Sequence, residues 1–226
     1  MKTIISTQPD ISLYGIRIQE PVTMLTDLLI SVICFYAFFQ LSSKTRPGKL
    51  NTYIKYHFLL MAIATFWGAV FGHGFQYIVG FAWRFPGWYL SMLSIMFIER
   101  ASIEHSRSVI KAGLLRTLLI VNIAELLIMF GLTAFTQKFI FVQFHSVYGV
   151  LGVVFSFHLY VYLKTKDIGS KYMLIGVAVA AIAAFVYNYP VILNPWFNNL
   201  DLAHVLMATT SFIFYKATLK LSENSI

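Results

Sequence analysis

Seven stretches of the chain are apolar over lengths that suit a membrane crossing. A transmembrane helix needs about 20 apolar residues to cross the ~30 Å hydrocarbon core of a bilayer. Loops rich in charge, proline or glycine separate the stretches, which cover residues 22–42, 54–78, 87–104, 112–135, 139–163, 171–193 and 200–221. The third is the weakest, because Glu99 and Arg100 interrupt its end. The sequence therefore predicts an all-α polytopic membrane protein, with seven transmembrane helices in one domain over residues 1–226.

Composition and charge support a membrane environment. Only 12% of the residues are charged and 58% are hydrophobic, which is more apolar surface than one soluble core could bury. The net charge of +8 raises the question of nucleic acid, but the basic residues lie between apolar runs and form no stripe with interleaved aromatic residues. We expect membrane lipids, not nucleic acid, as partners. The single cysteine, Cys34, excludes an intrachain disulfide.

The distribution of lysine and arginine predicts an orientation. If successive helices cross the membrane in opposite directions, 13 of the 17 basic residues fall on one side of it. The other side holds Lys2, Arg17, Arg84 and Lys138. Basic loops stay on the cytoplasmic side. The N-terminus is therefore expected outside and the C-terminus inside a cell membrane. Without the third helix, the basic loops around residues 44–55 and 164–171 would face opposite sides, so charge favours seven crossings.

Ionisable side chains collect in the outer half of the predicted bundle. Such groups are costly inside a membrane unless they are paired or have a function. Six of them, on four predicted helices or at their outer ends, share this depth: Glu20, Asp27, His73, His145, Asp201 and His204. Random placement would scatter them over both halves, so we expect them to meet.

Imidazole and carboxylate together are a ligand set for zinc. Asp201 and His204 are three residues apart, so both project from one face of the last helix. The predicted metal ligands are His73, Asp201, His204 and His145. A water activated by the metal would attack an amide or ester of a lipid-like substrate. Asp27 would act as general base, and Glu20 as a second-shell group or as a second cation site.

Three other interpretations stay open at this point. The outer groups can be a structural network that only holds the helices together. A b-type haem carrier would use His57 with His158 and His73 with His145 as axial pairs. A sensor or transporter would need polar groups through both leaflets, and Asn122, Glu125 and His158 are the candidates. Asn122 and Glu125 share one helix face, and a hydrogen-bonded clamp between helices is the simpler explanation for them.

The order of these parts resembles the CREST superfamily of seven-helix membrane hydrolases, which includes alkaline ceramidases and adiponectin receptors. The resemblance is distant, through bacterial seven-helix membrane proteins, and rests on Glu20-Pro21, His73 and His204. It implies a zinc-dependent hydrolase of lipid amides or related bonds. The chain departs from the family pattern at Ala69, where a serine is expected, at Arg84, where an acid is expected, and at Leu200, where the other histidine of the last helix is expected.

Overall fold

The computed structural model describes residues 8–45, 47–189 and 193–223. Most of this chain is helical, and its α-helices are α1 (Pro21–Lys44), α2 (Lys49–Trp67), α3 (Gln76–Val79), α4 (Arg84–His105), α5 (Ala112–Thr136), α6 (Ile140–Val147), α7 (Phe155–Thr165), α8 (Ile168–Asn188) and α9 (Asn199–Glu223). Two π-helices interrupt longer rods: η1 (Gly68–Gly74) extends α2, and η4 (Tyr148–Val154) joins α6 to α7. Short 3-10 segments are η2 (Phe81–Trp83) and η3 (Ser106–Ser108).

Six helical rods in the described residues are long and apolar enough to cross a membrane. They are α1, α2 with η1, α5, α6 to α7 with η4, α8 and α9. This confirms a helical bundle suited to a membrane. The continuous rod formed by the predicted stretch 54–78 ends at Gly74, before the predicted end. The predicted stretch 171–193 includes residues 190–192, which lie outside the described residues.

The third predicted stretch forms helix α4 of 22 residues, which is not among the six apolar rods. Its position explains its polarity. It packs against α2, α5, α6 and both π-helices, and its buried residues include Ser94, Glu99 and Ser102. A helix enclosed by other helices can carry polar side chains that a lipid-facing helix cannot.

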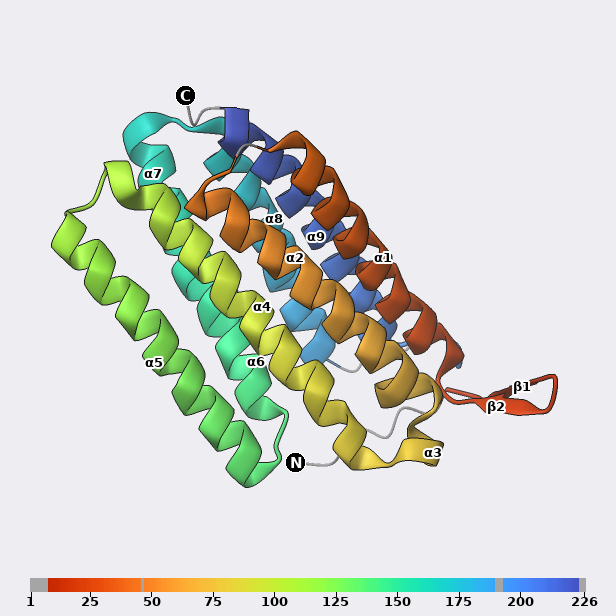
Figure 1. Ribbon diagram of the computed structural model, residues 1–226. Helices are drawn as coiled ribbons and strands as arrows, with labels where there is room; N and C mark the ends of the chain where they lie inside the picture. Colours follow the sequence, from red (N-terminus) through yellow and green to blue (C-terminus); the bar gives the residue numbers. More distant parts are fainter. Residues whose placement is uncertain (1–7, 46, 190–192, 224–226) are drawn as a thin grey trace.

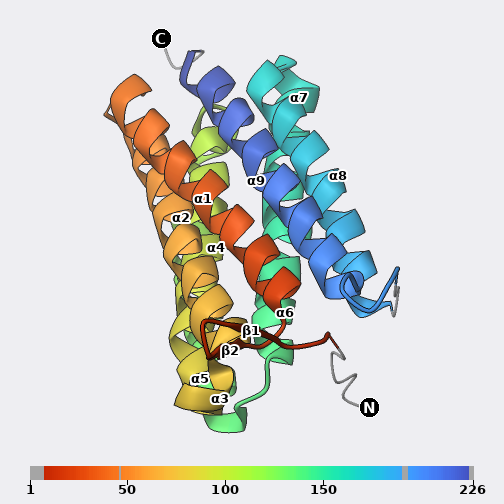
Figure 2. The ribbon, with the colours of Figure 1, turned by 90° about the vertical axis from the view of Figure 1, so that its right-hand side faces the viewer.

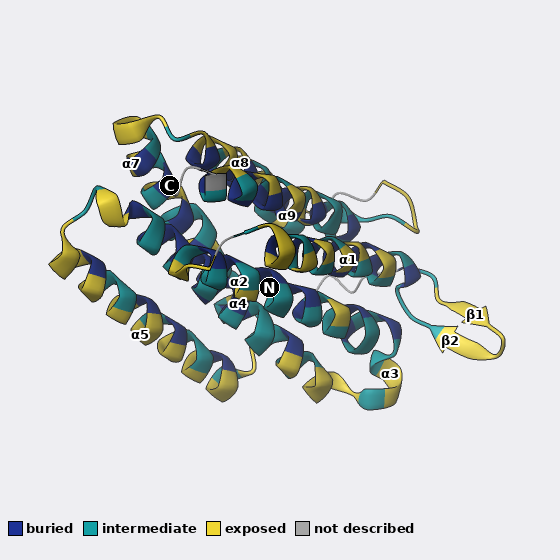
Figure 3. Ribbon diagram, turned by 45° about the horizontal axis from the view of Figure 1, so that its top comes forward, coloured by how far each residue is buried: buried dark blue, intermediate teal, exposed yellow. Residues whose placement is uncertain are grey.

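The helices form a ring with one outlier (Figure 1). Each helix contacts the next in the order α1, α2, α4, the α6–α7 rod, α8 and α9. Helix α9 contacts α1 and so closes the ring. Helix α5 stands outside this ring and packs on α4 and α6. Figure 3 shows exposed residues along α5 and buried residues concentrated inside the ring. Only 17% of the apolar window of α5 is buried, which is the smallest share among the six rods; the share for α9 is 44%.

A β-hairpin that the sequence analysis did not foresee precedes α1. Strand β1 (Ile11–Leu13) pairs antiparallel with β2 (Ile16–Ile18). Tyr14 and Gly15 form the turn with φ of 52° and 80°, the two positive values that a two-residue type I′ hairpin requires. The hairpin and the end of α9 lie at opposite ends of the bundle (Figures 1 and 2). We call the first of these the hairpin end.

Candidate functional site

Four of the six predicted outer residues meet at the hairpin end. We call Glu20, Asp27, His73 and His204 the hairpin-end group; they come from the start of α1, from η1 and from α9. The imidazole rings of His73 and His204 have centroids 6.1 Å apart in an edge-to-face arrangement. Nδ1 of His73 lies 2.6 Å from Glu20 Oε2, and Nε2 of His204 lies 3.9 Å from Asp27 Oδ1.

The hairpin-end group is sheltered but not sealed. The side chains of His73 and Glu20 are 18% and 23% exposed, and those of His204 and Asp27 are 14% and 10% exposed. Each of the four side chains is therefore mostly covered by protein but keeps some exposed surface.

The backbone at both sides of the His73–Glu20 contact is fixed by local structure. Glu20 has φ of 40°, a left-handed conformation that is unfavourable for a residue with a Cβ. Gln19 N–H donates to the Gly74 carbonyl at 3.0 Å, which ties the start of α1 to the end of η1. Arg84 donates to the Gly72 carbonyl at 3.0 Å. Strained backbone that the surroundings hold in place is common at functional sites.

The π-helix η1 begins with a glycine, Gly68, which leaves space for the carboxylate of Asp27. A π-helical turn carries an extra residue, and such turns often mark functional sites. His73 lies in this turn. At its start, a Cβ on Gly68 would come 2.8 Å from Asp27 Oδ2, closer than real contacts allow. Only glycine at this position leaves Asp27 in the place that it occupies beside His204.

Hydrogen bonds on Nδ1 orient both histidines. Thr26 Oγ1 donates its proton to the Thr23 carbonyl at 3.0 Å, so it accepts from Nδ1–H of His204 at 3.2 Å. Nε2 of His204 then carries the free lone pair, and it faces Asp27. In His73 the Nδ1 atom is taken by Glu20, which leaves Nε2 as its ligand atom. Metal-binding histidines typically have this pattern, with the second nitrogen held by an oxygen.

Asp201 joins the hairpin end in a different way. Its carboxylate is fully buried and accepts hydrogen bonds from Gln8 Nε2, Thr23 Oγ1 and Asn198 N–H, each at 2.7 Å. Asn198 Oδ1 in turn accepts from Leu200 N–H at 2.8 Å, which makes a reciprocal cap at the start of α9. Asp201 therefore links the N-terminal segment, α1 and α9.

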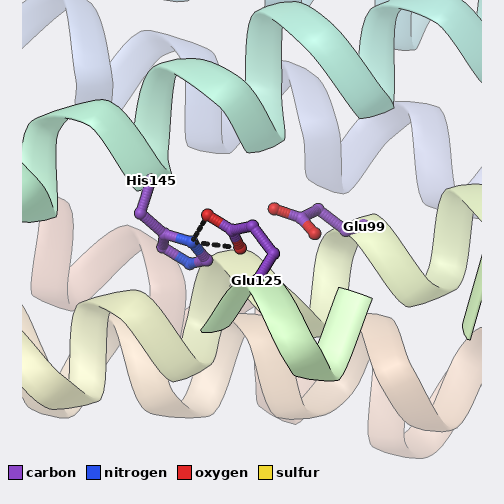
Figure 4. Close-up of side chains that lie close together, drawn as sticks. All are labelled: Glu99, Glu125 and His145. Carbon is purple, nitrogen blue, oxygen red and sulfur yellow. Dashed lines mark hydrogen bonds and ion pairs between the residues drawn. The ribbon is translucent and has the colours of Figure 1, made fainter. Parts of the chain in front are cut away.

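His145 lies in another group. Its Nδ1 is 2.8 Å from Glu125 Oε2, and Figure 4 shows both side chains with Glu99 close by. In the described part of the chain, Glu99, Glu125 and His145 can hold a metal ion, since one ligand atom of each lies within 4.8 Å of the others. The sequence predicts His145 among the outer residues and Glu99 at the end of the third apolar stretch. Glu99 is fully buried.

The remaining predicted polar residues make separate contacts. His57 pairs with Ser94, with Nδ1 2.8 Å from Oγ. His158 stacks on His105 with centroids 5.3 Å apart and has Nδ1 3.1 Å from Ser170 Oγ. These contacts do not join the two histidines of either haem pair. Asn122 donates to Glu99 and to the Met96 carbonyl, a clamp between α5 and α4 of the kind expected.

Several residues of the hairpin end had no signal in the sequence. Gln8 is 7% exposed, and its Oε1 accepts from Val22 N–H and Thr23 N–H at 3.3 Å and 3.4 Å. It thereby caps α1, whose residue before Pro21 provides no side-chain cap. A lone glutamine or threonine is ordinary at a chain end, so only the tertiary contacts identify Gln8 and Thr26.

Residues 22–223 match a protein family described as "Family of unknown function (DUF6962)". The match covers most of the 226-residue chain. No curated protein and no solved structure matches the chain.

Proposed function

The chain belongs to the DUF6962 family, and we propose that it is a metal-dependent membrane hydrolase that cleaves an amide or ester bond of a lipid-like molecule. The reaction takes place at the hairpin-end group. The bundle crosses a cell membrane seven times, with its N-terminus outside and its C-terminus in the cytoplasm. The site then lies near the outer surface.

One observation carries this proposal: two histidines far apart in the sequence meet with their Nδ1 atoms held by oxygens and a carboxylate beside them. The ring centroids of His73 and His204 are 6.1 Å apart, and Asp27 lies 3.9 Å from His204. In each ring an oxygen holds Nδ1, so Nε2 is the atom available as a ligand.

The donor types suit zinc, which binds imidazole nitrogen and carboxylate oxygen at about 2.0–2.2 Å. His204 Nε2 and Asp27 Oδ1 are 3.9 Å apart, wider than the roughly 3.3–3.6 Å between two ligands of a tetrahedral ion at that distance, so both side chains must close on the ion. We propose His73, His204 and Asp27 as the three protein ligands. Their ligand atoms do not lie within 4.8 Å of one another in this structure, so binding would have to draw the three side chains together. Such a metal supplies Lewis acidity at the scissile carbonyl and lowers the pKa of a water.

The neighbouring residues orient these ligands. Glu20 fixes the ring of His73, and Thr26 fixes that of His204. Second-shell contacts of this kind set the tautomer and raise the basicity of the ligand. The roles differ from the sequence-based expectation, which had Asp27 as base and Asp201 and His145 as ligands. Asp201 already accepts three hydrogen bonds, and His145 is engaged with Glu125.

Seven crossings are supported by length and charge together. Helix α4 has 22 residues, which corresponds to about 33 Å at the usual rise and is enough to span the hydrocarbon core. Its polar side chains face other helices. Counting α4 as a crossing keeps the basic loops at residues 44–55, 100–116 and 164–171 on one side.

His73→Ala is expected to lower the metal content by one equivalent and the hydrolytic activity by at least about 100-fold, because a lost ligand has a larger effect than the 10–100-fold of a second-shell change. His105→Ala is the matched control. Nε2 of His105 lies 3.3 Å from Asp167 Oδ2, and the side chain is 15% exposed, but His105 is the last residue of α4, far from the hairpin end. The measurements are metal content of the purified protein and turnover of fluorogenic long-chain amide and ester probes in mixed micelles.

A protein that carries no stoichiometric metal, or one in which His73→Ala hydrolyses every probe as fast as the wild type, contradicts the proposal.

Gly68→Ala tests the geometry without removing any ligand. The added Cβ must displace the carboxylate of Asp27, so we expect turnover and metal affinity to fall about 10-fold or more. Gly72→Ala, in the same π-helix, is the control, because nothing lies within 4 Å of the Cβ that it adds. Metal titration and steady-state rates of the two variants give the comparison; equal loss in both would point to a general effect on η1.

A further inference from the structure

We propose that Glu99, Glu125 and His145 bind one divalent transition-metal ion between α4, α5 and α6. We call this set the interhelical triad. It is separate from the hairpin-end group, and its argument does not depend on the function proposed above.

The three side chains converge from three helices (Figure 4). One ligand atom of each lies within 4.8 Å of the other two. The Met92 carbonyl can only accept, so Nε2 of His145, 2.9 Å away, carries a proton and donates it. Nδ1 of His145 is therefore the inward atom, and it lies 3.0 Å and 2.8 Å from the two oxygens of Glu125. A backbone carbonyl that holds the second nitrogen is typical of a metal-binding histidine.

Glu99 supplies an independent reason to expect a ligand. Its side chain is fully buried. Asn122 Nδ2 donates to Oε2, whereas Oε1 has no hydrogen-bond partner among the described residues. Buried polar atoms in native proteins are almost always satisfied. The free oxygen belongs to the side chain that points toward Glu125 and His145, so an ion among the three would satisfy it.

The charges match a divalent ion. With a metal on Nδ1 of His145 the imidazole would be neutral, the two carboxylates would carry two negative charges, and a dication would make the group neutral. An uncompensated charge is strongly unfavourable in a dry interior, and paired or metal-bound carboxylates are the usual solution. Mixed nitrogen and oxygen donors favour zinc, iron or manganese over calcium or magnesium.

The fold makes room for this group at one glycine. The π-helix η4 begins three residues after His145 and contains Gly149. A Cβ on Gly149 would overlap Glu99 Oε1 and Ile95 Cγ2. The π-helical turn and the missing side chain thus allow α4 to bring Glu99 up to α6. Both π-helices of the described chain adjoin a carboxylate–histidine group.

The site explains how α5 stays attached. Helix α5 lies outside the ring and contacts α4 and α6, the helices that provide Glu99 and His145. Glu125 is near the middle of α5. An ion shared by the three helices therefore acts as a cross-link that holds the peripheral helix to the bundle.

The test counts metal in a background without the two histidines of the hairpin-end group. The double variant His73→Ala/His204→Ala is purified in detergent, incubated with Zn²⁺ or Mn²⁺, desalted and analysed by mass spectrometry for metal per protein. We expect one equivalent, and we expect it to be lost when Glu99→Gln is added. Glu104→Gln on the same helix removes a carboxylate that pairs with Arg107 instead, and it should keep the equivalent.

Thermal unfolding provides the second readout. Added metal should raise the melting temperature of the double variant by about 5 °C or more, and Glu99→Gln should abolish this shift. Equal metal content with and without Glu99→Gln overturns the proposal, as does a double variant that binds no metal. A failure of the hydrolase assay alone leaves both readouts unaffected, so the two proposals are tested separately.

Discussion

Replacing Asp201 by alanine should lower the free energy of unfolding by about 3–5 kcal/mol, because hydrogen bonds to a buried charged acceptor contribute about 1.5–3 kcal/mol each. Asp201 accepts three of them, from Gln8, Thr23 and Asn198. The substitution removes the acceptor of two buried donors, Gln8 Nε2 and Thr23 Oγ1, and of the part-buried N–H of Asn198. It also separates the N-terminal segment from α9. Reversible unfolding in mixed micelles of a mild and a denaturing detergent measures the change.

Asp10→Ala is the control for this prediction. Arg17 Nε donates to Asp10 Oδ2 at 2.6 Å, but the pair is largely exposed. Exposed ion pairs contribute about 0–1 kcal/mol. If both variants unfold at the same denaturant fraction, the buried cluster around Asp201 has no special role in stability.

Gly149→Ala should destabilise the bundle by about 2–3 kcal/mol, the upper part of the range of about 1–3 kcal/mol for an extra methyl group forced into a packed interior. Its Cβ would overlap Glu99 and Ile95, both on α4, and neither is free to move toward solvent. The gain in helix propensity from glycine to alanine, up to about 1 kcal/mol, offsets only part of this loss. The measurement is again unfolding in mixed micelles, together with metal content.

Gly131→Ala is the matched variant. Gly131 lies within α5, and nothing lies within 4 Å of the Cβ that the substitution adds. Helix propensity should then dominate and leave stability unchanged or raised by about 0.5–1 kcal/mol. A Gly149→Ala protein as stable as Gly131→Ala would mean that α4 and α6 are not in the close contact described here.

The interior of the bundle shows why part of the site was predictable. Asp27, His73 and His204 are ionisable groups at similar depths on apolar helices, and that alone predicts that they pair. Depth, however, does not give rotation about the helix axis or the identity of the neighbouring helix. His145 has a similar depth to His73, yet it faces α4 and α5. Asp201 is three residues from His204 but turns toward Gln8.

The sequence by itself determined that the chain forms long apolar helices and gave the positions of six of them. It also determined which side chains are too polar to face lipid. These properties depend only on local composition and length. Only the tertiary structure decided the partners. The π-helices at Gly68–Gly74 and Tyr148–Val154, the burial of Glu99 on the central helix α4, and the split between the hairpin-end group and the interhelical triad all depend on contacts between distant segments. Such contacts follow from how helices rotate and pack against one another, which hydropathy does not encode.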